Sequence, residues 1–334
     1  MNDKLKQTIA EASKVFILTD ENVARLWLPE LRCFLECDAV VDIVIKAGEK
    51  EKKFVNVRRI WSALMYYNAD RNALLINFGG GVITDLGGFA ASTYKRGIKF
   101  VNIPTTLLGM VDAAIGGKTG INLNGAKNLI GTFAEPEEVA VMPDFLYTLP
   151  KREILSGLTE MLKYGFVFDP ELLKVNLENY RDYILRAGQI KRAIAEKDLF
   201  DHDVRKVLNF GHTFGHAIES HSLTTDNPLL HGEAVALGMI GALYLSVPLL
   251  GLRESVLKSY ENLLPMLLSE AKVSLSKDDM SSIMQRVAFD KKRANQRSQF
   301  VLLYGIGEPV WDVEIEPKWA KQALEYVINK ASNR

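Results

Sequence analysis

Histidines and their polar neighbours carry the clearest chemical signal in the sequence. Four polar residues at spacings of four, three and four positions predict one polar stripe along a helix: Arg205, Asn209, His212 and His216. Imidazoles at positions i and i+4 of a helix can share one ion, so this spacing favours His212 and His216 as a zinc pair. A lone histidine is more often a hydrogen-bonded structural residue, but four aligned polar groups are harder to explain in that way.

A ligand set drawn from several segments is the alternative to this pair. Glu160 and Lys163 lie three residues apart in an otherwise apolar segment, and His231 stands at the start of an apolar helical pattern. A carboxylate and two histidines that leave coordination positions open are the usual ligands of a catalytic metal, which favours a site that includes Glu160. The residue pattern alone leaves both ligand sets open.

A glycine turn at residues 79–81 follows a predicted strand and precedes a predicted helix. Glycines at such a point allow a pyrophosphate to approach the backbone N–H groups of the helix N-terminus. The pattern is not the G-x-G-x-x-G fingerprint of dinucleotide-binding folds, so a purely structural turn is an equally good interpretation. Asp20 and Asn22 follow the first predicted strand, where such residues either contact a nucleotide or cap a helix.

A polar segment at residues 104–128 follows another predicted strand. Its lysines, asparagines and glycines are suited to surround an anion, and we interpret the segment as a loop that contacts phosphate.

The composition excludes several classes of protein. The 41 basic and 41 acidic residues of the 334-residue chain cancel, so no net charge attracts nucleic acid or an anionic membrane. Cys33 and Cys37 are too few for a disulfide scaffold in a chain of this length. The first residues lack the apolar core of a signal peptide, and the most apolar stretch, residues 234–250, contains glycines and a proline that suit a buried helix. We therefore expect a cytoplasmic protein with small ligands.

The elements that would position these residues fall into two groups. β-branched runs alternate with helical patterns in the first part of the chain, which is typical of a parallel α/β sheet. Strands are predicted at residues 15–18, 40–45, 73–78, 100–103 and 139–142, and helices at 56–67 and 86–93. Later segments are long, amphipathic and helical, apart from a strand-like run at 300–304. We predict an α/β domain at residues 1–147 and a mainly α-helical domain at 148–334.

Five motifs, in the same order along the chain, resemble those of 3-dehydroquinate synthases, a family of sugar-phosphate cyclases. They lie at residues 79–86, 111–122, 125–131, 160–165 and 208–216. The resemblance implies a Rossmann-like N-terminal domain that binds NAD, a mainly helical C-terminal domain that binds metal and substrate, and an active site in the cleft between them. Three features depart from the family pattern: Thr84 replaces a usual glycine, Asp201 replaces a usual glutamate, and the interval from His212 to His231 is a few residues longer than is usual in the family.

The resemblance also implies roles for individual residues. Zinc or cobalt would be bound by Glu160, His212 and His231. NAD would be contacted by Asp20, Asn22, Glu49, Lys52, Gly80, Gly81, Asp85, Thr105 and Thr106, together with Asp112, Lys118 and Lys127. Substrate binding and catalysis would involve Asp112, Lys118, Lys127, Asn128, Lys163, Lys191, Arg205, Asn209, His216 and one of Lys291 or Lys292.

The substrate implied by the resemblance is 3-deoxy-D-arabino-heptulosonate 7-phosphate, a sugar-acid phosphate of the shikimate pathway to aromatic amino acids. Transient oxidation by NAD, β-elimination of phosphate, reduction and an intramolecular aldol closure would give 3-dehydroquinate. An arginine at the position of Arg96 reaches the phosphate in the neighbouring subunit of this family, which implies a homodimer. The alternatives are a related sugar-phosphate cyclase, a metal-dependent polyol dehydrogenase, and a non-catalytic NAD-binding or scaffold protein that has kept the fold.

Overall fold

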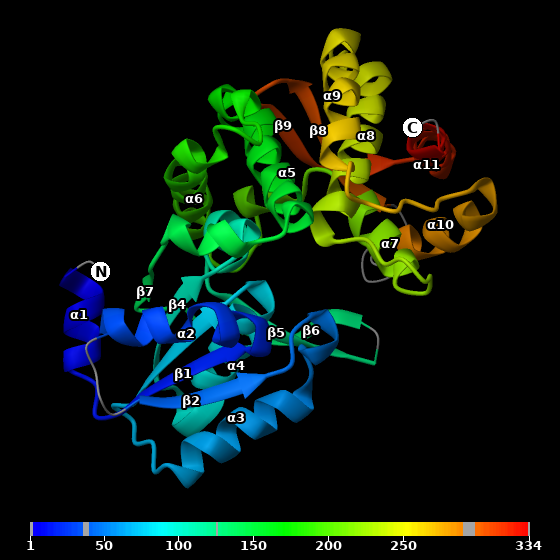
Figure 1. Ribbon diagram of the computed structural model, residues 1–334. Helices are drawn as coiled ribbons and strands as arrows, with labels where there is room; N and C mark the ends of the chain where they lie inside the picture. The colour runs from blue at the N-terminus through cyan, green and yellow to red at the C-terminus, as the bar shows by residue number, and fades with distance from the viewer. Residues whose placement is uncertain (1–2, 36–39, 125, 290–297, 333–334) are drawn as a thin grey trace. The chain divides into compact units, whose positions relative to one another are not determined.

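A five-stranded sheet with the order β2-β1-β3-β4-β7 organises the first part of the chain in the computed structural model, and every pair of strands is parallel (Figure 1). The strands are β1 (Val15–Asp20), β2 (Val40–Ile45), β3 (Leu74–Gly79), β4 (Lys99–Pro104) and β7 (Glu138–Val139). The predicted parallel α/β sheet is confirmed. The direction of the strand order reverses between β1 and β3, and ligands of open α/β sheets bind outside the carboxyl ends of strands at such a reversal.

The structure describes residues 3–35, 40–124, 126–289 and 298–332. The chain folds into two units: the first comprises Met1–Leu149 with Lys191–Phe200, and the second comprises Pro150–Ile190 with Asp201–Arg334. Cys37, Lys291 and Lys292 lie outside the described residues, so the predicted substrate contact from one of these lysines stays a prediction.

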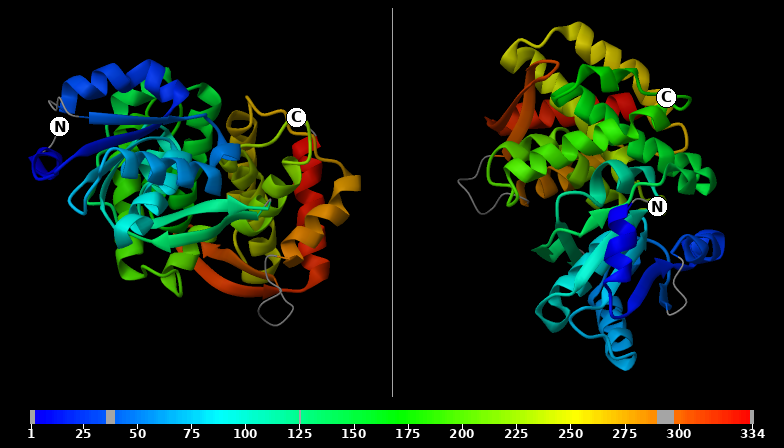
Figure 2. Two further views of the ribbon diagram at one scale, coloured as in Figure 1. Left: turned by 90° about the horizontal axis from the view of Figure 1, so that it is seen from below. Right: turned by 90° about the vertical axis from the view of Figure 1, so that its left-hand side faces the viewer.

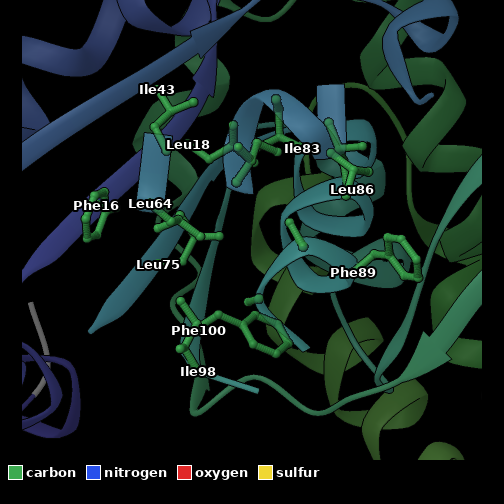
Figure 3. Close-up of a cluster of buried hydrophobic side chains, with 14 of the residues drawn as sticks. Phe16, Leu18, Ile43, Leu64, Leu75, Ile83, Leu86, Phe89, Ile98 and Phe100 are labelled. Carbon is green, nitrogen blue, oxygen red and sulfur yellow. The ribbon is translucent and has the colours of Figure 1, made fainter. Parts of the chain in front are cut away.

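Apolar side chains on one face of the main sheet pack against two helices of the first unit. Its helices are α1 (Asp3–Ala10), α2 (Glu21–Leu35), α3 (Phe54–Tyr66) and α4 (Gly81–Thr93). Figure 3 shows side chains of this core, including Phe16, Leu18, Ile43, Leu64, Leu75, Ile83 and Leu86. Phe16 and Leu18 alternate with residues that face the other side of β1, and both are fully buried. Burial of each such side chain stabilises the fold by about 1.5–3 kcal/mol.

Most predicted elements lie within one or two residues of their observed bounds, and α4 and β7 differ more. Helix α4 begins at Gly81 rather than at residue 86, so the glycine turn is itself the start of the helix. Strand β7 has two residues, Glu138–Val139, rather than the four predicted at 139–142, and a 3-10 helix, Pro143–Thr148, follows it.

The predicted polar loop after β4 is largely an antiparallel β-hairpin, so that prediction was wrong. Its strands are β5 (Lys118–Leu123) and β6 (Ala126–Phe133). Gly120 is paired with Gly131, and a Cβ atom on either glycine would lie within 2.7 Å of a backbone oxygen on the opposite strand. Glycines that suggested a loop therefore allow the two strands to approach each other.

The second unit is mainly helical, as predicted. Its elements are α5 (Lys151–Val167), α7 (His212–Ser222), α8 (His231–Leu250), α9 (Glu254–Leu267), α10 (Met280–Phe289), α11 (Pro317–Ser332), and the hairpin of β8 (Ser298–Gly305) and β9 (Glu308–Ile315) (Figure 2). Helix α6 (Tyr180–Lys197) contributes residues to both units. Helix α8 is long and apolar enough to cross a membrane by composition alone, but 72% of its most apolar window is buried, as in the core helix of a globular protein.

Candidate active site

Glu160 and Lys163 lie in the most buried part of α5. Every residue from 155 to 167 of this helix is buried, and the Glu160 side chain is fully inaccessible to solvent. The ammonium group of Lys163 forms an ion pair with the Glu160 carboxylate one helical turn away. A buried ion pair is often no more stabilising than apolar residues of the same size, so the pair of Glu160 and Lys163 here points to a function that requires it.

Two imidazoles face the same carboxylate oxygen. Nε2 of His212 lies 3.6 Å from Oε1 of Glu160, and Nε2 of His231 lies 3.5 Å from that oxygen. The ligand atoms of the three residues all lie within 4.8 Å of one another. Zinc bound to nitrogen and oxygen at about 2.0–2.2 Å in a tetrahedral site has ligand atoms roughly 3.4 Å apart. Two nitrogens and one carboxylate oxygen at this spacing fit a catalytic metal with an open coordination position.

The second ring nitrogen of each histidine faces a hydrogen-bond acceptor. Nδ1 of His212 lies 3.0 Å from the carbonyl oxygen of Phe210, and Nδ1 of His231 lies 3.4 Å from Oε2 of Glu219. A proton on each Nδ1 satisfies these acceptors, so Nε2, which faces Glu160, is the ring nitrogen that can bind a metal. Hydrogen bonds of this kind fix the orientation of metal-binding histidines.

The predicted helix through Arg205, Asn209, His212 and His216 is wrong. A 3-10 helix, Val204–Asn209, carries the first two residues, and α7 begins only at His212. Gly211 separates the two helices with a φ of 78°, a left-handed conformation that interrupts an α-helix. Arg205 is buried and Asn209 ends the 3-10 helix, so the two pairs of residues occupy different elements.

His216 belongs to a second group of possible ligands, which contains Glu219 and His231. Its ring centroid lies 5.1 Å from that of His212, but within the described ranges neither group of three combines His212 with His216. The structure therefore favours the ligand set distributed over α5, α7 and α8 above the pair suggested by spacing.

The start of α8 is held by a charged pair. Arg152 donates to both carboxylate oxygens of Glu233, at 2.6 Å to Oε1 and 2.7 Å to Oε2. Oε2 of Glu233 also accepts a hydrogen bond of 2.7 Å from the backbone N–H of Leu230. A glutamate at this position caps the first turn of the helix, whose first residue is His231.

A second contact joins α5 to the same turn. The backbone N–H of Gly232 donates to Oγ of Ser156 at 3.0 Å. A Cβ atom on Gly232 would lie 2.2 Å from the carbonyl oxygen of Ser156, so only glycine allows this approach. Ser156 lies one helical turn before Glu160, and the contact therefore brings His231 to the ligand carboxylate.

Glycines also set the distance between α7 and α8. A Cβ atom on Gly238 would lie 1.9 Å from the carbonyl oxygen of Gly211, and one on Gly215 would lie 3.1 Å from the α-carbon of Val235. The absence of side chains at these points lets the two helix backbones touch. Because His212 begins α7 and His231 begins α8, this packing places the two imidazoles with ring centroids 5.2 Å apart.

Burial and neighbouring charges shift the pKa values of the two histidines in opposite directions. Burial and the nearby Lys163 lower the pKa of His212 well below its usual value, so its ring is neutral. Burial also disfavours a charge on His231, but hydrogen bonds to the carboxylates of Glu160 and Glu219 outweigh it and raise the pKa to about 10. The neutral ring is ready to bind a metal, whereas His231 must first release a proton.

Polar residues of the first unit lie at the carboxyl ends of adjacent strands. Asp20 ends β1, and its Oδ1 accepts from the backbone N–H groups of Asn22 at 2.9 Å and Val23 at 3.1 Å. Asp20 therefore caps α2, and burial raises the pKa of its carboxyl group.

The glycine turn lies beside a threonine that follows β4. Gly80 precedes the first residue of α4, and a Cβ atom on it would lie 2.9 Å from the methyl group of Thr106. The backbone N–H of Thr105 donates to the carbonyl oxygen of Gly79 at 3.0 Å, which ties β4 to the turn. Gly81 begins the helix, so the N-terminal N–H groups of α4 lie at the reversal in strand order.

A lysine at the centre of a polar group joins three segments of the first unit. Lys52 is buried, and its ammonium group contacts the carboxylate of Asp85 on α4 and the side-chain oxygen of Asn128 on β6. Burial raises the pKa of Asp85, although Lys52 opposes this effect. Glu49 lies nearby in sequence and accepts a hydrogen bond of 2.8 Å from Asn122.

The other predicted residues of the first unit are less closely grouped. Nζ of Lys191 donates to Oδ1 of Asp112 at 2.6 Å. Lys127 lies 3.8 Å from the Glu49 carboxylate, and Lys118 is exposed on β5. Arg96 is also exposed, and its φ of 67° places it in the left-handed region. The roles of all these residues stay predictions.

Two residues that help to hold His231 in place were missed by reasoning from the sequence: Glu219, which faces its ring, and Arg152, which pairs with Glu233 in the first turn of the same helix. Glu219 lies three residues after His216 and seven after His212 on α7, so helical spacing marks it as part of the same face. Arg152 has no comparable signal, because its partner Glu233 lies on a different helix, far along the chain.

Both parts of the chain match family descriptions. Residues 42–156 match 3-dehydroquinate synthase N-terminal, and residues 157–293 match 3-dehydroquinate synthase C-terminal. A 3-dehydroquinate synthase from Parabacteroides distasonis is 40% identical over 93% of this chain and 89% of its own length. Another from Clostridium tetani is 38% identical over 96% of this chain and 87% of its own length.

Solved structures with a similar fold include other cyclases and, at lower similarity, dehydrogenases. A 2-epi-5-epi-valiolone synthase from Streptomyces hygroscopicus, with NAD+ and Zn2+ bound, has a TM-score of 0.84 at 29% identity and covers 96% of this chain and 92% of its own. A protein from Sinorhizobium meliloti described as a probable glycerol dehydrogenase has a TM-score of 0.61 at 14% identity and covers 99% of this chain and 96% of its own. The matched domains and close relatives show that the chain belongs to the 3-dehydroquinate synthase family.

Proposed function

We propose that this protein is a 3-dehydroquinate synthase that converts 3-deoxy-D-arabino-heptulosonate 7-phosphate to 3-dehydroquinate and phosphate. The observation that carries the proposal is the convergence of Glu160, His212 and His231, two imidazole nitrogens facing one buried carboxylate oxygen. These residues would hold a divalent zinc or cobalt ion. The relatives that share this chain's family carry the name of the same enzyme.

NAD is the second cofactor that we assign. Its pyrophosphate would lie against the backbone of Gly80 and Gly81 at the N-terminus of α4, where N–H groups and the helix dipole favour an anion. Asp20, Thr105 and Thr106 lie at the carboxyl ends of the strands beside this turn, which supports their assignment to the nucleotide. Glu49, Lys52 and Asp85 belong to the adjacent polar group and are assigned to the same cofactor.

The cofactors supply the redox step when bound: NAD accepts and returns a hydride, while the metal makes the substrate hydroxyl more acidic. The protein's own contribution is to hold a substrate with two anionic groups, a carboxylate and a phosphate, in one geometry. Arg205 offers a planar fork of donors for a carboxylate or phosphate, and Lys163 offers a point charge beside the metal ligands. Asn209 and His216 would complete the contacts from the second unit. Fixed geometry favours both β-elimination and ring closure, because each needs one substrate conformation.

The remaining cations would contact substrate from the first unit: Lys118, Lys127 and Lys191, with Asp112 and Asn128 as their polar neighbours. We further propose a cytoplasmic homodimer in which Arg96 reaches the substrate phosphate of the neighbouring subunit. The exposed position of Arg96 supports this role.

A metal-dependent polyol dehydrogenase is the second candidate, favoured by the fold shared with glycerol and iron-containing alcohol dehydrogenases. Identity to these proteins is 14%, and their likeness therefore concerns the fold alone. A neutral polyol has no use for so many lysines and a buried arginine, whereas a phosphorylated sugar acid does.

The test combines purified protein, the heptulosonate phosphate, a catalytic amount of NAD and a divalent metal. Phosphate release and NADH absorbance are followed together. A synthase releases phosphate without net accumulation of NADH, whereas a dehydrogenase accumulates NADH in proportion to the substrate consumed. Phosphate release that continues without NAD would contradict the proposed redox cycle.

A further inference from the structure

Glu219 is a buried carboxylate outside the assigned ligand set. It lies on α7 with 4% of its surface exposed, and its Oε2 lies 3.4 Å from Nδ1 of His231. On the opposite edge of the same ring, Nε2 lies 3.5 Å from Oε1 of Glu160. The imidazole of His231 is therefore held between two carboxylates, one on α5 and one on α7.

We propose that Glu219 is a positioning residue that prepares His231 to bind the metal. Its carboxylate accepts a hydrogen bond from Nδ1–H of His231, which leaves Nε2 as the nitrogen that binds the metal, and its charge makes the ring a stronger electron donor to that metal. This inference rests on the proposed function, because it assigns the metal to the group formed by Glu160, His212 and His231.

The two histidines differ in how they are oriented. Nδ1 of His212 donates to the backbone carbonyl of Phe210, an acceptor that a side-chain substitution does not remove. His231 depends on the side chain of Glu219 for the corresponding hydrogen bond. A change at Glu219 should therefore weaken one ligand and leave the other in place.

The same geometry allows one competing role. Glu219 also forms a possible ligand group with His216 and His231, so a second ion bound there would make Glu219 a metal ligand itself. Because His231 belongs to both groups, the number of ions bound per chain distinguishes the two roles.

The experiment compares the full chain with Glu219→Gln, Glu219→Ala and Glu261→Gln. Glu261 is a mostly buried glutamate on α9 in the same unit, paired with Lys330 at 2.8 Å, and it controls for the loss of a carboxylate as such. Zinc stoichiometry and affinity are measured by competition with a chelator. The tautomer of His231 in the zinc-loaded protein is read from long-range 15N–1H correlations, a signal that a general loss of stability does not change.

We expect one zinc ion per native chain and a His231 ring protonated at Nδ1. Glu219→Gln should bind zinc about 10-fold more weakly and Glu219→Ala up to roughly 100-fold more weakly, while Glu261→Gln matches the native affinity. Native affinity in Glu219→Gln would overturn the positioning role alone, as would two ions in the native chain with loss of one in the variant. A native chain that binds no zinc would instead overturn the proposed function as well. The tautomer measurement needs only the native protein, so protonation at Nε2 would refute the inference even if the variants failed to fold.

Discussion

Arg152 donates two hydrogen bonds to the carboxylate of Glu233, and this carboxylate in turn caps the first turn of α8. The guanidinium group is partly exposed, whereas the Glu233 side chain is 2% exposed. Removal of the arginine would leave a buried carboxylate without its counter-charge beside the residue that begins the helix, His231.

Arg152→Ala should lower the free energy of unfolding by about 2 kcal/mol, somewhat less than a fully buried pair because water reaches the arginine side. It should also weaken zinc binding, since the start of α8 loses a restraint. Denaturant titration and chelator competition measure the two effects. Lys151→Ala removes a neighbouring exposed ion pair with Glu270 and should change stability by about 0.5 kcal/mol or less. Equal losses of stability in Arg152→Ala and Lys151→Ala would argue against a specific role of the Arg152–Glu233 pair.

His212→Ala should remove bound metal and activity together, because two ligands remain. His216→Ala is its matched control on the same helix. Its metal content should stay near one ion per chain, while its activity should fall because the substrate phosphate is bound less tightly. Metal analysis after gel filtration and the phosphate-release assay check both results. Full metal content in His212→Ala would contradict the ligand set.

Zinc affinity should rise with pH. The pKa of His231 is raised to about 10, so the ring carries a proton at neutral pH that the metal must displace, whereas His212 is already neutral. Between about pH 7 and 9 the affinity should increase about tenfold per unit, with one proton released. Calorimetry in buffers of different ionisation enthalpy counts that proton. A zinc affinity that stays constant between about pH 7 and 9, after correction for the chelator, would contradict the assignment of His231 as a ligand that must lose a proton.

The same pKa shift affects the stability of the metal-free protein. The charge on His231 stabilises the fold fully below the pKa of the unfolded state, 6.5, and this contribution is lost as the pH rises towards 10.

Arg205→Lys should weaken substrate binding about tenfold or more, because lysine keeps the charge and loses the planar fork. Arg205 is buried in the second unit, while its neighbour Lys206 pairs with Asp312 at 2.7 Å near the surface. Lys206→Arg is therefore expected to keep the native KM. Steady-state kinetics at saturating NAD compares the variants, and an unchanged KM in Arg205→Lys would count against a direct contact with substrate.

Gly80→Ala should destabilise the first unit and weaken NAD binding. The added methyl group would lie 2.9 Å from the methyl group of Thr106, and overpacking of this kind costs about 1–3 kcal/mol. Thr106→Ser removes that methyl group and keeps the hydroxyl that accepts from the backbone N–H of Gly109, so the double variant should recover most of the loss. Thermal unfolding and fluorescence titration with NADH measure the two effects. If the double variant recovers neither stability nor NADH affinity, contact with the methyl group of Thr106 is not the cause of the loss.

Sequence reasoning predicted the features that local pattern determines. The β-branched runs gave the strands of the main sheet, and apolar composition gave the buried helix α8. It failed where glycines alter the local structure. Gly211, the N-cap of α7, separates this helix from the preceding 3-10 helix, and Gly120 and Gly131 allow two strands to approach closely where a loop was predicted. Both glycines and polar residues occur in loops and in closely packed strands, so composition could not separate these outcomes.

The candidate site shows the same limit over longer distances. Helical spacing related His212 to His216 but could not relate either residue to Glu160 on another helix. Only the resemblance to known enzymes selected His231 as a ligand. The contacts that hold this histidine in place, from Arg152 through Glu233 and from Glu219, depend on how three helices pack.

The glycine contacts between α7 and α8 have a consequence for how this enzyme can change over evolution. Main-chain atoms, and not interdigitated side chains, set the spacing of the two helices at Gly211 and Gly238. Surrounding apolar residues can therefore drift without altering the separation of the imidazoles. A single methyl group at Gly238 would push the helices apart, so this position should tolerate no other amino acid in any descendant that keeps the metal.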